Sequence, residues 1–449
     1  MSSASLTKQQ IQQNILRYDA PLYFYDFHRI DEQVAKLDRY LPDNFRLHYT
    51  LKANSNLAVC NHLAKLGVSA DISSIGELVT TIKAGFAPEK ILFTGPGKTK
   101  KELSFALKQG IGLIVIESVN EARLLNSIAQ ELGIQQDILV RINPGYRSAN
   151  SCDVSQGASA SCEIKVSDET EIPVAQLISE SASKFGVDEA IVSDAMKDIV
   201  AFENLNLKGI HIFTESNLLE YEQLVASCQN TINIANRLAD EGYPISTIDF
   251  GGGMGIPYND VDPEFDVEAF GKRMQEISDN NPYDYQFIFE LGRYVVCQAG
   301  SYVTEVVDIK ESQGKKFFIL NGGVHQMLRL SMRTANKYMD IIGKDKSKLP
   351  TEKVTFAGKL PTPLDIMCED VDVPTNVEIG DRIIIYNCGA YGFNHSMTNF
   401  TLHNYPMEVA HYQGEVKVIR DSGKVEDFFV NQNMPFGDGV KTPEEVALV

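Results

Sequence analysis

The chain has 449 residues, of which 43% are hydrophobic and 22% are charged, and its formal net charge is -19 at pH 7. This length allows two domains and a large core, and the composition is that of an ordinary soluble globular protein. The negative charge argues against nucleic acid as a partner, because nucleic-acid binding needs a concentrated basic surface.

Targeting and metal signals are also lacking in the sequence. Residues 1–14 are polar, and no apolar run reaches the ~20 residues of a membrane helix. We therefore expect a cytoplasmic protein with no membrane partner. The seven cysteines are scattered and form no C-x-x-C pair, which argues against a disulfide framework or a structural zinc site, and we expect no metal.

An alternation of strand and helix patterns organises the first two thirds of the chain. A short strand at 22–25 and a helix over 29–41 come first, and three later helices open with capping-box patterns at 74–77, 99–102 and 118–121. Eight strands separated by helices predict an α/β fold with a (β/α)8 TIM barrel at residues 36–300. The predicted strands lie at 45–51, 68–72, 91–94, 112–116, 137–142, 207–213, 246–250 and 286–290.

Two regions depart from this alternation. Residues 148–170 are rich in Ser, Ala and Asp, and we interpret them as a surface insertion, with a plain long loop as the alternative. From residue 301 the pattern is strand-like at 302–307, 316–320, 382–386 and 415–419, with few helices between. These segments predict a second, mostly β domain made of residues 301–449 and of residues 1–35, whose strand would complete it.

Chemically distinctive residues occur where the predicted barrel strands end. Lys52 ends the first strand, where a desolvated amine can form a Schiff base, although a solvated lysine is the plain alternative. Because the carboxyl ends of barrel strands converge on one face, residues distant in sequence share one site there. The other strand-end residues are Asp71, Arg141, His211 with Thr214, Gly251, Gly252 and Gly253, and Glu290 followed by Gly292 and Arg293.

These groups together suggest pyridoxal phosphate as a cofactor. A glycine run after strand seven allows backbone amides to approach a phosphate, with Thr214 and Gly292 adding donors. Lys52 would hold the aldehyde carbon as a Schiff base, and Glu290 would pair with the pyridine nitrogen. His211 and Arg141 would lie beside the ring.

Eight short segments in this order resemble a known family, the pyridoxal-phosphate decarboxylases of the alanine-racemase-like fold (fold type III). The group includes diaminopimelate, ornithine/arginine and siderophore-pathway decarboxylases. The sequence Glu-Leu-Gly-Arg-Tyr from Glu290 favours the siderophore and antibiotic-pathway branch. The matching segments are 48–54, 71–74, 141–144, 184–186, 209–211, 251–253, 290–293 and 389–392.

The resemblance implies a decarboxylase with a small amino-acid substrate, such as a diamino acid, a diaminopimelate-like compound or a siderophore intermediate. It implies a homodimer with shared active sites, in which the β domain of one subunit supplies Tyr391 to the other. Substrate contacts would come from Arg293, Arg329, Thr362 and Asp365. The implied cofactor contacts are Lys52, Asp71, Arg141, His211, Thr214, Gly251, Gly252, Gly253, Glu290, Gly292, Arg293 and Tyr391.

One departure from the family concerns proton donation. Aligned on Gly358 and Asp365, the position of the family's proton-donating cysteine holds Pro361, which has no proton to give. Cys368 lies seven residues late in a Cys-Glu-x-x-Asp pattern, and Cys388 lies three residues before Tyr391. The candidates for the proton source are therefore these two cysteines, Lys52, His211 or water.

Three alternatives accompany the decarboxylase prediction. Racemases of this fold place an arginine opposite the pyridine nitrogen, so Glu290 argues against that reaction. A regulatory paralogue with altered catalysis is favoured by Pro361 and opposed by Lys52 and the complete set of cofactor residues. A phosphosugar-binding barrel enzyme would leave Lys52 without a role.

Overall fold

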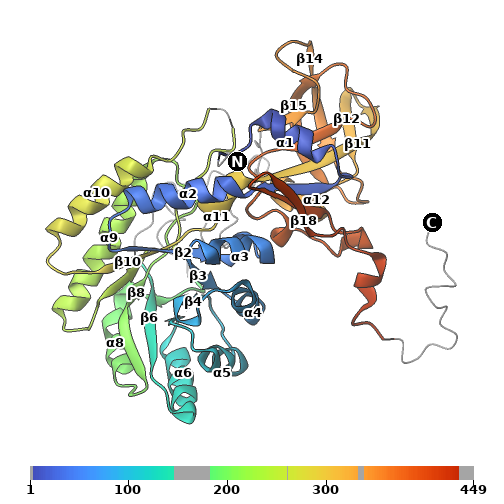
Figure 1. Ribbon diagram of the computed structural model, residues 1–449. Helices are drawn as coiled ribbons and strands as arrows, with labels where there is room; N and C mark the ends of the chain where they lie inside the picture. Colours follow the sequence, from blue (N-terminus) through green and yellow to red (C-terminus); the bar gives the residue numbers. More distant parts are fainter. Residues whose placement is uncertain (1–3, 146–182, 260, 332–337, 434–449) are drawn as a thin grey trace.

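The computed structural model describes residues 4–145, 183–259, 261–331 and 338–433, and Figure 1 shows a barrel beside a second sheet. The predicted insertion at 148–170 lies outside the described residues. In the described part of the chain, no helix combines the length and the apolar character needed to cross a bilayer.

Eight parallel strands form the barrel and confirm the predicted fold. The strand order runs from β5 through β4, β3, β2, β10, β9 and β8 to β6, and β6 pairs with β5 to close the ring. A two-residue strand, β7 (Val187–Asp188), adds to β6. The barrel strands are β2 (Phe45–Thr50), β3 (Ser69–Ile72), β4 (Ile91–Phe93), β5 (Leu113–Ile116), β6 (Gln136–Asn143), β8 (Leu205–His211), β9 (Thr247–Asp249) and β10 (Gln286–Glu290).

Helices follow the strands as the alternation predicts. Of the three predicted capping boxes, the one at Thr99 has both of its hydrogen bonds. Glu77 bonds the amide of Ser73 and Glu121 bonds Lys98 instead of their own N-caps. The helices around the barrel are α2 (Phe27–Tyr40), α3 (Leu57–Lys65), α4 (Ile75–Ala84), α5 (Lys100–Gln109), α6 (Val119–Leu132), α8 (Val192–Val200), α9 (Tyr221–Asp240), α10 (Val267–Asn280) and α11 (Arg293–Val296).

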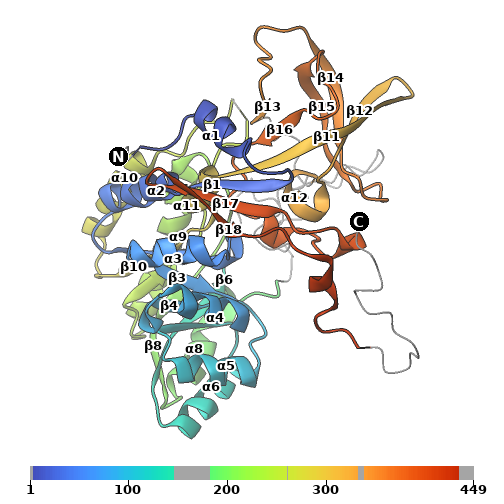
Figure 2. The same cartoon turned by 45° about the vertical axis from the view of Figure 1, so that its right-hand side comes forward.

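The second sheet is mixed and has nine strands. Its N-terminal strand β1 (Leu22–Asp26) lies between β11 and β17, antiparallel to the first and parallel to the second, as Figure 2 shows. This pairing places the N-terminal strand within the second sheet. The other strands are β11 (Gly300–Ser312), β12 (Lys315–Leu320), β13 (Met339–Ile341), β14 (Thr351–Ala357), β15 (Ile366–Pro374), β16 (Arg382–Ile385), β17 (Met407–Tyr412) and β18 (Glu415–Arg420).

The sequence pattern missed β13, β14, β15 and β17. Most of β15 alternates with charged residues and pairs only with β14 at the end of the sheet, so it lacks the continuous apolar run of a central strand. Two helices accompany this sheet, α1 (Lys8–Ile15) and α12 (Val324–Ser331). The domain boundaries near residues 36 and 300 stay a prediction.

Aromatic packing fixes the strands that present the site. Phe45 of β2 lies 5.1 Å from Phe287 and 5.3 Å from Phe289 of β10, measured between ring centroids. Phe250, directly after β9, lies 5.2 Å from both β10 rings. Each aromatic pair contributes about 0.5–1.5 kcal/mol beyond area burial. The tips of β2, β9 and β10 are therefore held in a fixed relation to one another.

Candidate active site

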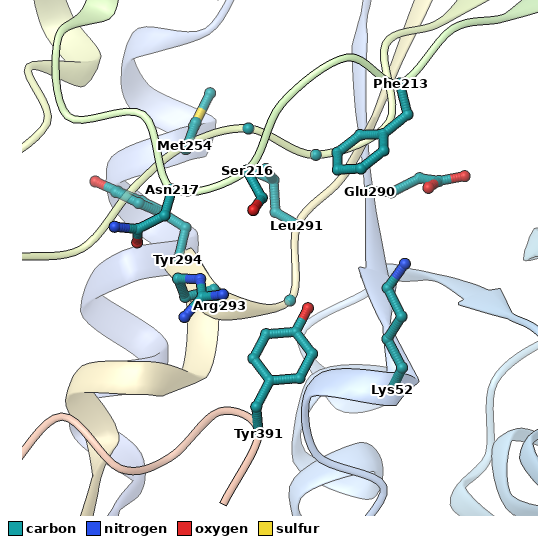
Figure 3. Close-up of a pocket in the computed structure, with 13 residues that line it drawn as sticks. Lys52, Phe213, Ser216, Asn217, Met254, Glu290, Leu291, Arg293, Tyr294 and Tyr391 are labelled. Carbon is teal, nitrogen blue, oxygen red and sulfur yellow. The ribbon is translucent and has the colours of Figure 1, made fainter. Parts of the chain in front are cut away.

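Lys52 lies in a single 3-10 turn, Leu51–Ala53, directly after β2. The hydroxyl of Tyr49 donates to the backbone carbonyl of Asn54 at 2.7 Å. The side-chain amide of Asn54 donates to the carbonyl of Gly389 at 3.0 Å. These bonds hold the turn against the loop from the second domain. Figure 3 shows the Lys52 amine pointing into a pocket toward Glu290 and Phe213, with its nitrogen 6.0 Å from the Phe213 ring centroid.

Glu290, at the end of β10, brings a buried carboxylate to the same pocket. Its register partner on β2 is His48, and His211 Nε2 lies 3.5 Å from its Oε1. Burial alone would raise the pKa of Glu290, but His211, Lys52 and Arg141 together lower it to about 2. Glu290 is therefore ionised at neutral pH, whereas burial lowers the pKa of His48 to about 4 and keeps it neutral.

Two further carboxyl groups lie beside Glu290. Asp71, at the tip of β3, accepts a hydrogen bond from the Thr94 hydroxyl at 2.7 Å. Asp249 ends β9 next to His211 of β8 in register. Burial and the charge of Glu290 raise the pKa of both aspartates well above the usual value. Sequence reasoning missed Asp249, although its place at a strand end was a signal that could have identified it.

The electrostatics keep the Lys52 amine protonated in the absence of a ligand. Burial would lower its pKa, but Tyr391, Asp71 and Glu290 raise the pKa above that of an ordinary lysine. The strand-end lysine thus stands among groups that stabilise a positive charge at Nζ.

A glycine-rich loop after β9 forms the opposite wall of the pocket. Gly251 and Gly253 have φ values of +63° and +138°, and a Cβ at either position would come within 2.7 Å of Phe213 or Leu224. The amide of Leu218 donates to the carbonyl of Gly253 at 2.8 Å and thereby joins this loop to the loop after β8. Gly252 and Gly253 line the pocket as predicted.

The loop after β8 carries the predicted cofactor residue Thr214. Thr214 bonds Ser227 of α9 at 2.6 Å between hydroxyl oxygens and is not among the residues lining the pocket. Ser216 and Asn217 line it instead, next to Gly252 and Gly253. β8 ends at His211 and the loop then crosses the glycine run, so the cofactor contact of Thr214 stays a prediction.

Arg293 begins α11 and is stacked between two tyrosines. It donates to the hydroxyl of Tyr258 at 2.6 Å, and its guanidinium carbon lies 4.8 Å from the ring centroid of Tyr391. Tyr391 has a φ of +56°, and its amide donates to the carbonyl of Ala53 beside Lys52. The prediction that Tyr391 serves a second subunit is therefore wrong for this pocket, because Tyr391 lines the pocket of its own chain.

Arg141, on β6, is oriented by a residue that sequence reasoning did not single out. It forms an ion pair of 3.0 Å with Glu117, which also accepts a hydrogen bond from the amide of Gly186 at 2.6 Å. The guanidinium carbon lies 4.2 Å from the ring centroid of Phe185. Glu117 directly follows β5, so its place at a strand end could have identified it.

The loop at 358–365, between β14 and β15, wraps around one carboxylate. Asp365 is 2% exposed and accepts hydrogen bonds from the amides of Val324 and Leu360, each at 2.8 Å. Thr362 lies within this loop and bonds its own backbone neighbours at Leu360 and Leu364. The contacts of Asp365 favour a positioning role over direct substrate contact. The side chain of Arg329 lies outside the described residues.

Neither candidate cysteine is among the residues that line the pocket. Cys368 lies on β15 opposite Phe356, and burial raises the pKa of its thiol to about 12. Cys388 is 1% exposed, and its thiol donates to the carbonyl of Tyr386 at 3.3 Å. Cys388 has the surroundings of a buried structural cysteine, and Cys368 is half-buried.

Comparisons with known proteins agree with this geometry. Residues 27–162 and 153–297 match the family model of the pyridoxal-dependent decarboxylase, pyridoxal binding domain. The L-glutamyl-[BtrI acyl-carrier protein] decarboxylase of Niallia circulans is 31% identical over 95% of this chain and 97% of its own length. The 2-[(L-alanin-3-ylcarbamoyl)methyl]-2-hydroxybutanedioate decarboxylase of Staphylococcus aureus is 28% identical over 86% of this chain and 92% of its own length.

Solved structures give the same result. The crystal structure of diaminopimelate decarboxylase from Helicobacter pylori complexed with L-lysine superposes with a TM-score of 0.80 at 27% identity, covering 93% of this chain and 98% of that one. The sequence match, the shared fold and the pocket of strand-end residues all agree. This chain belongs to the pyridoxal-phosphate-dependent decarboxylases of the alanine-racemase-like fold.

Proposed function

We propose that this enzyme removes the α-carboxylate of an amino acid that carries a second polar group, such as a diamino acid, a diaminopimelate-like compound or a siderophore intermediate. One observation carries the proposal: Lys52, Gly252 and Glu290 line a single pocket. The names of the relatives support this substrate class, since they act on diaminopimelate, on a hydroxybutanedioate conjugate of an amino acid and on a glutamyl group bound to a carrier protein.

The residues present fit pyridoxal 5′-phosphate. Within the described residues, several buried polar atoms around the pocket have no hydrogen-bond partner, which is costly unless a ligand supplies one. These atoms are Asp71 Oδ2, Glu290 Oε1 and both ring nitrogens of His211. Glu290 would face the pyridine nitrogen, and Gly252, Gly253 and Ser216 would hold the phosphate.

Each remaining group has a definable task. When bound, the cofactor supplies an aldehyde for amine exchange and a protonated ring that accepts the electrons freed as carbon dioxide leaves. The ionised Glu290 keeps a proton on the pyridine nitrogen because its own pKa is low. Arg141, held by Glu117, and His211 would contact the cofactor ring, and Arg293, held by Tyr258, would contact its phosphate.

The proton that replaces carbon dioxide needs a source in this chain. Pro361 offers none, and the thiols of Cys368 and Cys388 do not line the pocket. Lys52 stands in the pocket with a raised pKa, so its free ammonium would hold a proton at Nζ that it could donate. We assign the proton donation to Lys52.

Borohydride labelling tests the proposal. The purified enzyme should absorb at the wavelength of a lysine-bound cofactor, and reduction should fix the cofactor to Lys52. Lys98 is the control, because its side chain is buried and bonded to Gly95, Val115 and Glu121, whereas the side chain of Lys52 is exposed. Carbon dioxide release should then be screened with diamino acids, citryl conjugates and glutamyl carrier proteins. Label on Lys98, or no release from any of these, contradicts the proposal.

A catalytically altered regulatory paralogue is the second candidate, and Pro361 is the observation that favours it. Such a protein would bind pyridoxal phosphate through Lys52 but release no carbon dioxide. The labelling and the substrate screen therefore separate the two functions in one set of measurements. A racemase would instead invert the α-carbon, which chiral analysis of the same reactions would detect.

We further propose that the enzyme is a cytoplasmic homodimer with barrel boundaries near residues 36 and 300. Exposed apolar side chains on the β-domain loops, at Leu364, Phe400 and Leu402, support a contact with a second copy. Sedimentation analysis should give twice the monomer mass. A monomer that retains full activity would contradict shared active sites.

A further inference from the structure

Asp249 lies between the glycine loop after β9 and the carboxylate of Glu290. It is fully buried at the end of β9, and its Oδ1 accepts a hydrogen bond from the amide of Gly251 at 2.8 Å, at the start of the glycine loop. Its other oxygen, Oδ2, has no hydrogen-bond partner among the described residues. A buried carboxylate oxygen without a donor is costly, so this arrangement needs an explanation.

The neighbours of Asp249 supply one. A carboxylate oxygen of Asp249, one of Glu290 and a ring nitrogen of His211 all lie within 4.8 Å of one another. Two ionised carboxylates at this separation, away from water, repel each other strongly. One of the two carboxyl groups must therefore hold a proton, as in other buried acid pairs.

The surrounding charges decide which group is protonated. Glu290 is stabilised as an anion by His211, Lys52 and Arg141, which together lower its pKa to about 2 against the effect of burial. Asp249 has only the amide of Gly251 in its favour, while burial, Glu290 and Asp71 raise its pKa. The proton belongs on Asp249.

We propose that Asp249 acts as a neutral carboxylic acid that donates a hydrogen bond to Glu290 while accepting one from Gly251. As a positioning residue it would orient the Glu290 carboxylate toward the pyridine nitrogen. Its bond to Gly251 would also hold the glycine loop after β9 in place. The inference rests on the proposed role of Glu290 as the partner of that nitrogen. Asp71 differs from Asp249, because one of its oxygens accepts a hydrogen bond from Thr94 and the charge of Lys52 favours its ionised form.

Two substitutions separate a neutral from an ionised Asp249. Asparagine keeps an oxygen for Gly251 and a donor for Glu290, so Asp249→Asn should bind pyridoxal phosphate within about threefold of the unmodified apoenzyme. Asp249→Ala removes both bonds and should weaken cofactor binding by about tenfold or more. Titration of the apoenzymes with pyridoxal phosphate, followed by absorbance, measures both. Equal weakening by the two substitutions overturns the proposal, because an ionised aspartate would not be replaced by an amide.

The pH dependence of unfolding provides a second readout on the apoenzymes. A group whose pKa is raised on folding destabilises the folded state increasingly as pH rises above its unfolded pKa. Asp249→Asn should therefore gain in melting temperature over the unmodified protein between about pH 5 and about pH 8. Infrared difference spectra should show the carbonyl band of a neutral carboxylic acid in the unmodified protein that Asp249→Asn lacks.

A constant difference in melting temperature together with an absent band contradicts the proposal. These outcomes are distinct from a failure of the proposed function. If the unmodified enzyme bound no pyridoxal phosphate, the function would fail, while the band and the unfolding profile would still report the proton on Asp249.

Discussion

The barrel rim and the loop between β14 and β15 use their buried carboxyl groups in opposite ways. At the rim, Asp71, Asp249 and Glu290 each keep one oxygen that accepts no hydrogen bond from the described residues. In the loop, both oxygens of Asp365 accept bonds from backbone amides. A buried oxygen without a hydrogen bond persists only where another group compensates it. The carboxyl groups of the rim are therefore available to a ligand or to one another, whereas Asp365 holds the conformation of its loop.

The rim residues match those that bind the cofactor in the family, whereas the loop differs from the family at the position of the proton donor. The rim has the lysine, the glycine loop and the carboxylate that its relatives' cofactor requires. The loop has Pro361 at the position where the family resemblance implies a proton donor. We expect a change of this kind to leave cofactor binding intact and to alter the step that follows decarboxylation.

The largest expected effect comes from the rim. Glu290→Gln should lower the rate of carbon dioxide release by about 10²-fold or more, because the amide has the same shape but cannot hold a proton on the pyridine nitrogen. Glu121→Gln is the matched control, since Glu121 is also buried and bonded to a lysine, Lys98, but does not line the pocket. Steady-state assays of both variants test the claim. Similar losses in the two would remove Glu290 from the chemistry.

The loop should respond in stability rather than in chemistry. Asp365→Ala leaves the amides of Val324 and Leu360 without an acceptor and should lower the free energy of unfolding by about 2–4 kcal/mol. Asp372, on β15 in the same hairpin, is a control, because its ion pair with Lys353 is exposed and its removal should change stability little. Urea unfolding of the apoenzymes measures both. An unchanged Asp365→Ala would show that the loop is not held by this carboxylate.

The site residues that could be predicted from the sequence are those that lie at the ends of the barrel strands. The alternation of strands and helices predicted the barrel, and barrel geometry then placed Lys52 and Glu290 on one rim, because strand tips must converge there. That inference needs only the positions where strands end. Lys52 and Glu290, which lie at or directly after a strand tip, line one pocket, whereas the cofactor contacts of Asp71 and Arg141 stay predictions.

Residues beyond a tip could not be placed in this way. The loop after β8 brings Ser216 rather than Thr214 to the pocket, since its path depends on bonds to the glycine loop. Tyr391 reaches the pocket of its own chain through a left-handed backbone and a bond to Ala53. Such features depend on tertiary contacts that no local pattern encodes.

A smaller effect is expected from His48, the register partner of Glu290. Its pKa falls from 6.5 to about 4 on folding, so the unfolded chain binds more protons between these values and stability is lost as pH falls through that window. His48→Gln should reduce this loss by about 1–3 kcal/mol between pH 6.5 and pH 4. His403→Gln, on a half-buried histidine outside the pocket, is the comparison. Identical pH profiles for His48→Gln and the unmodified apoenzyme would contradict a neutral His48.

The smallest effect is expected from the two cysteines. Cys368→Ala and Cys388→Ala should each change the rate of product formation by less than about threefold, because neither thiol lines the pocket and donation by a side chain needs direct reach. Melting temperatures of both variants separate a packing loss at the buried Cys388 from a chemical one. A fall of about 10²-fold in either variant, with the fold retained, would mean that a thiol delivers the proton. In that case a thiol carried by the second sheet or its loops would take part in the chemistry, and the barrel rim would not be the sole source of reacting groups.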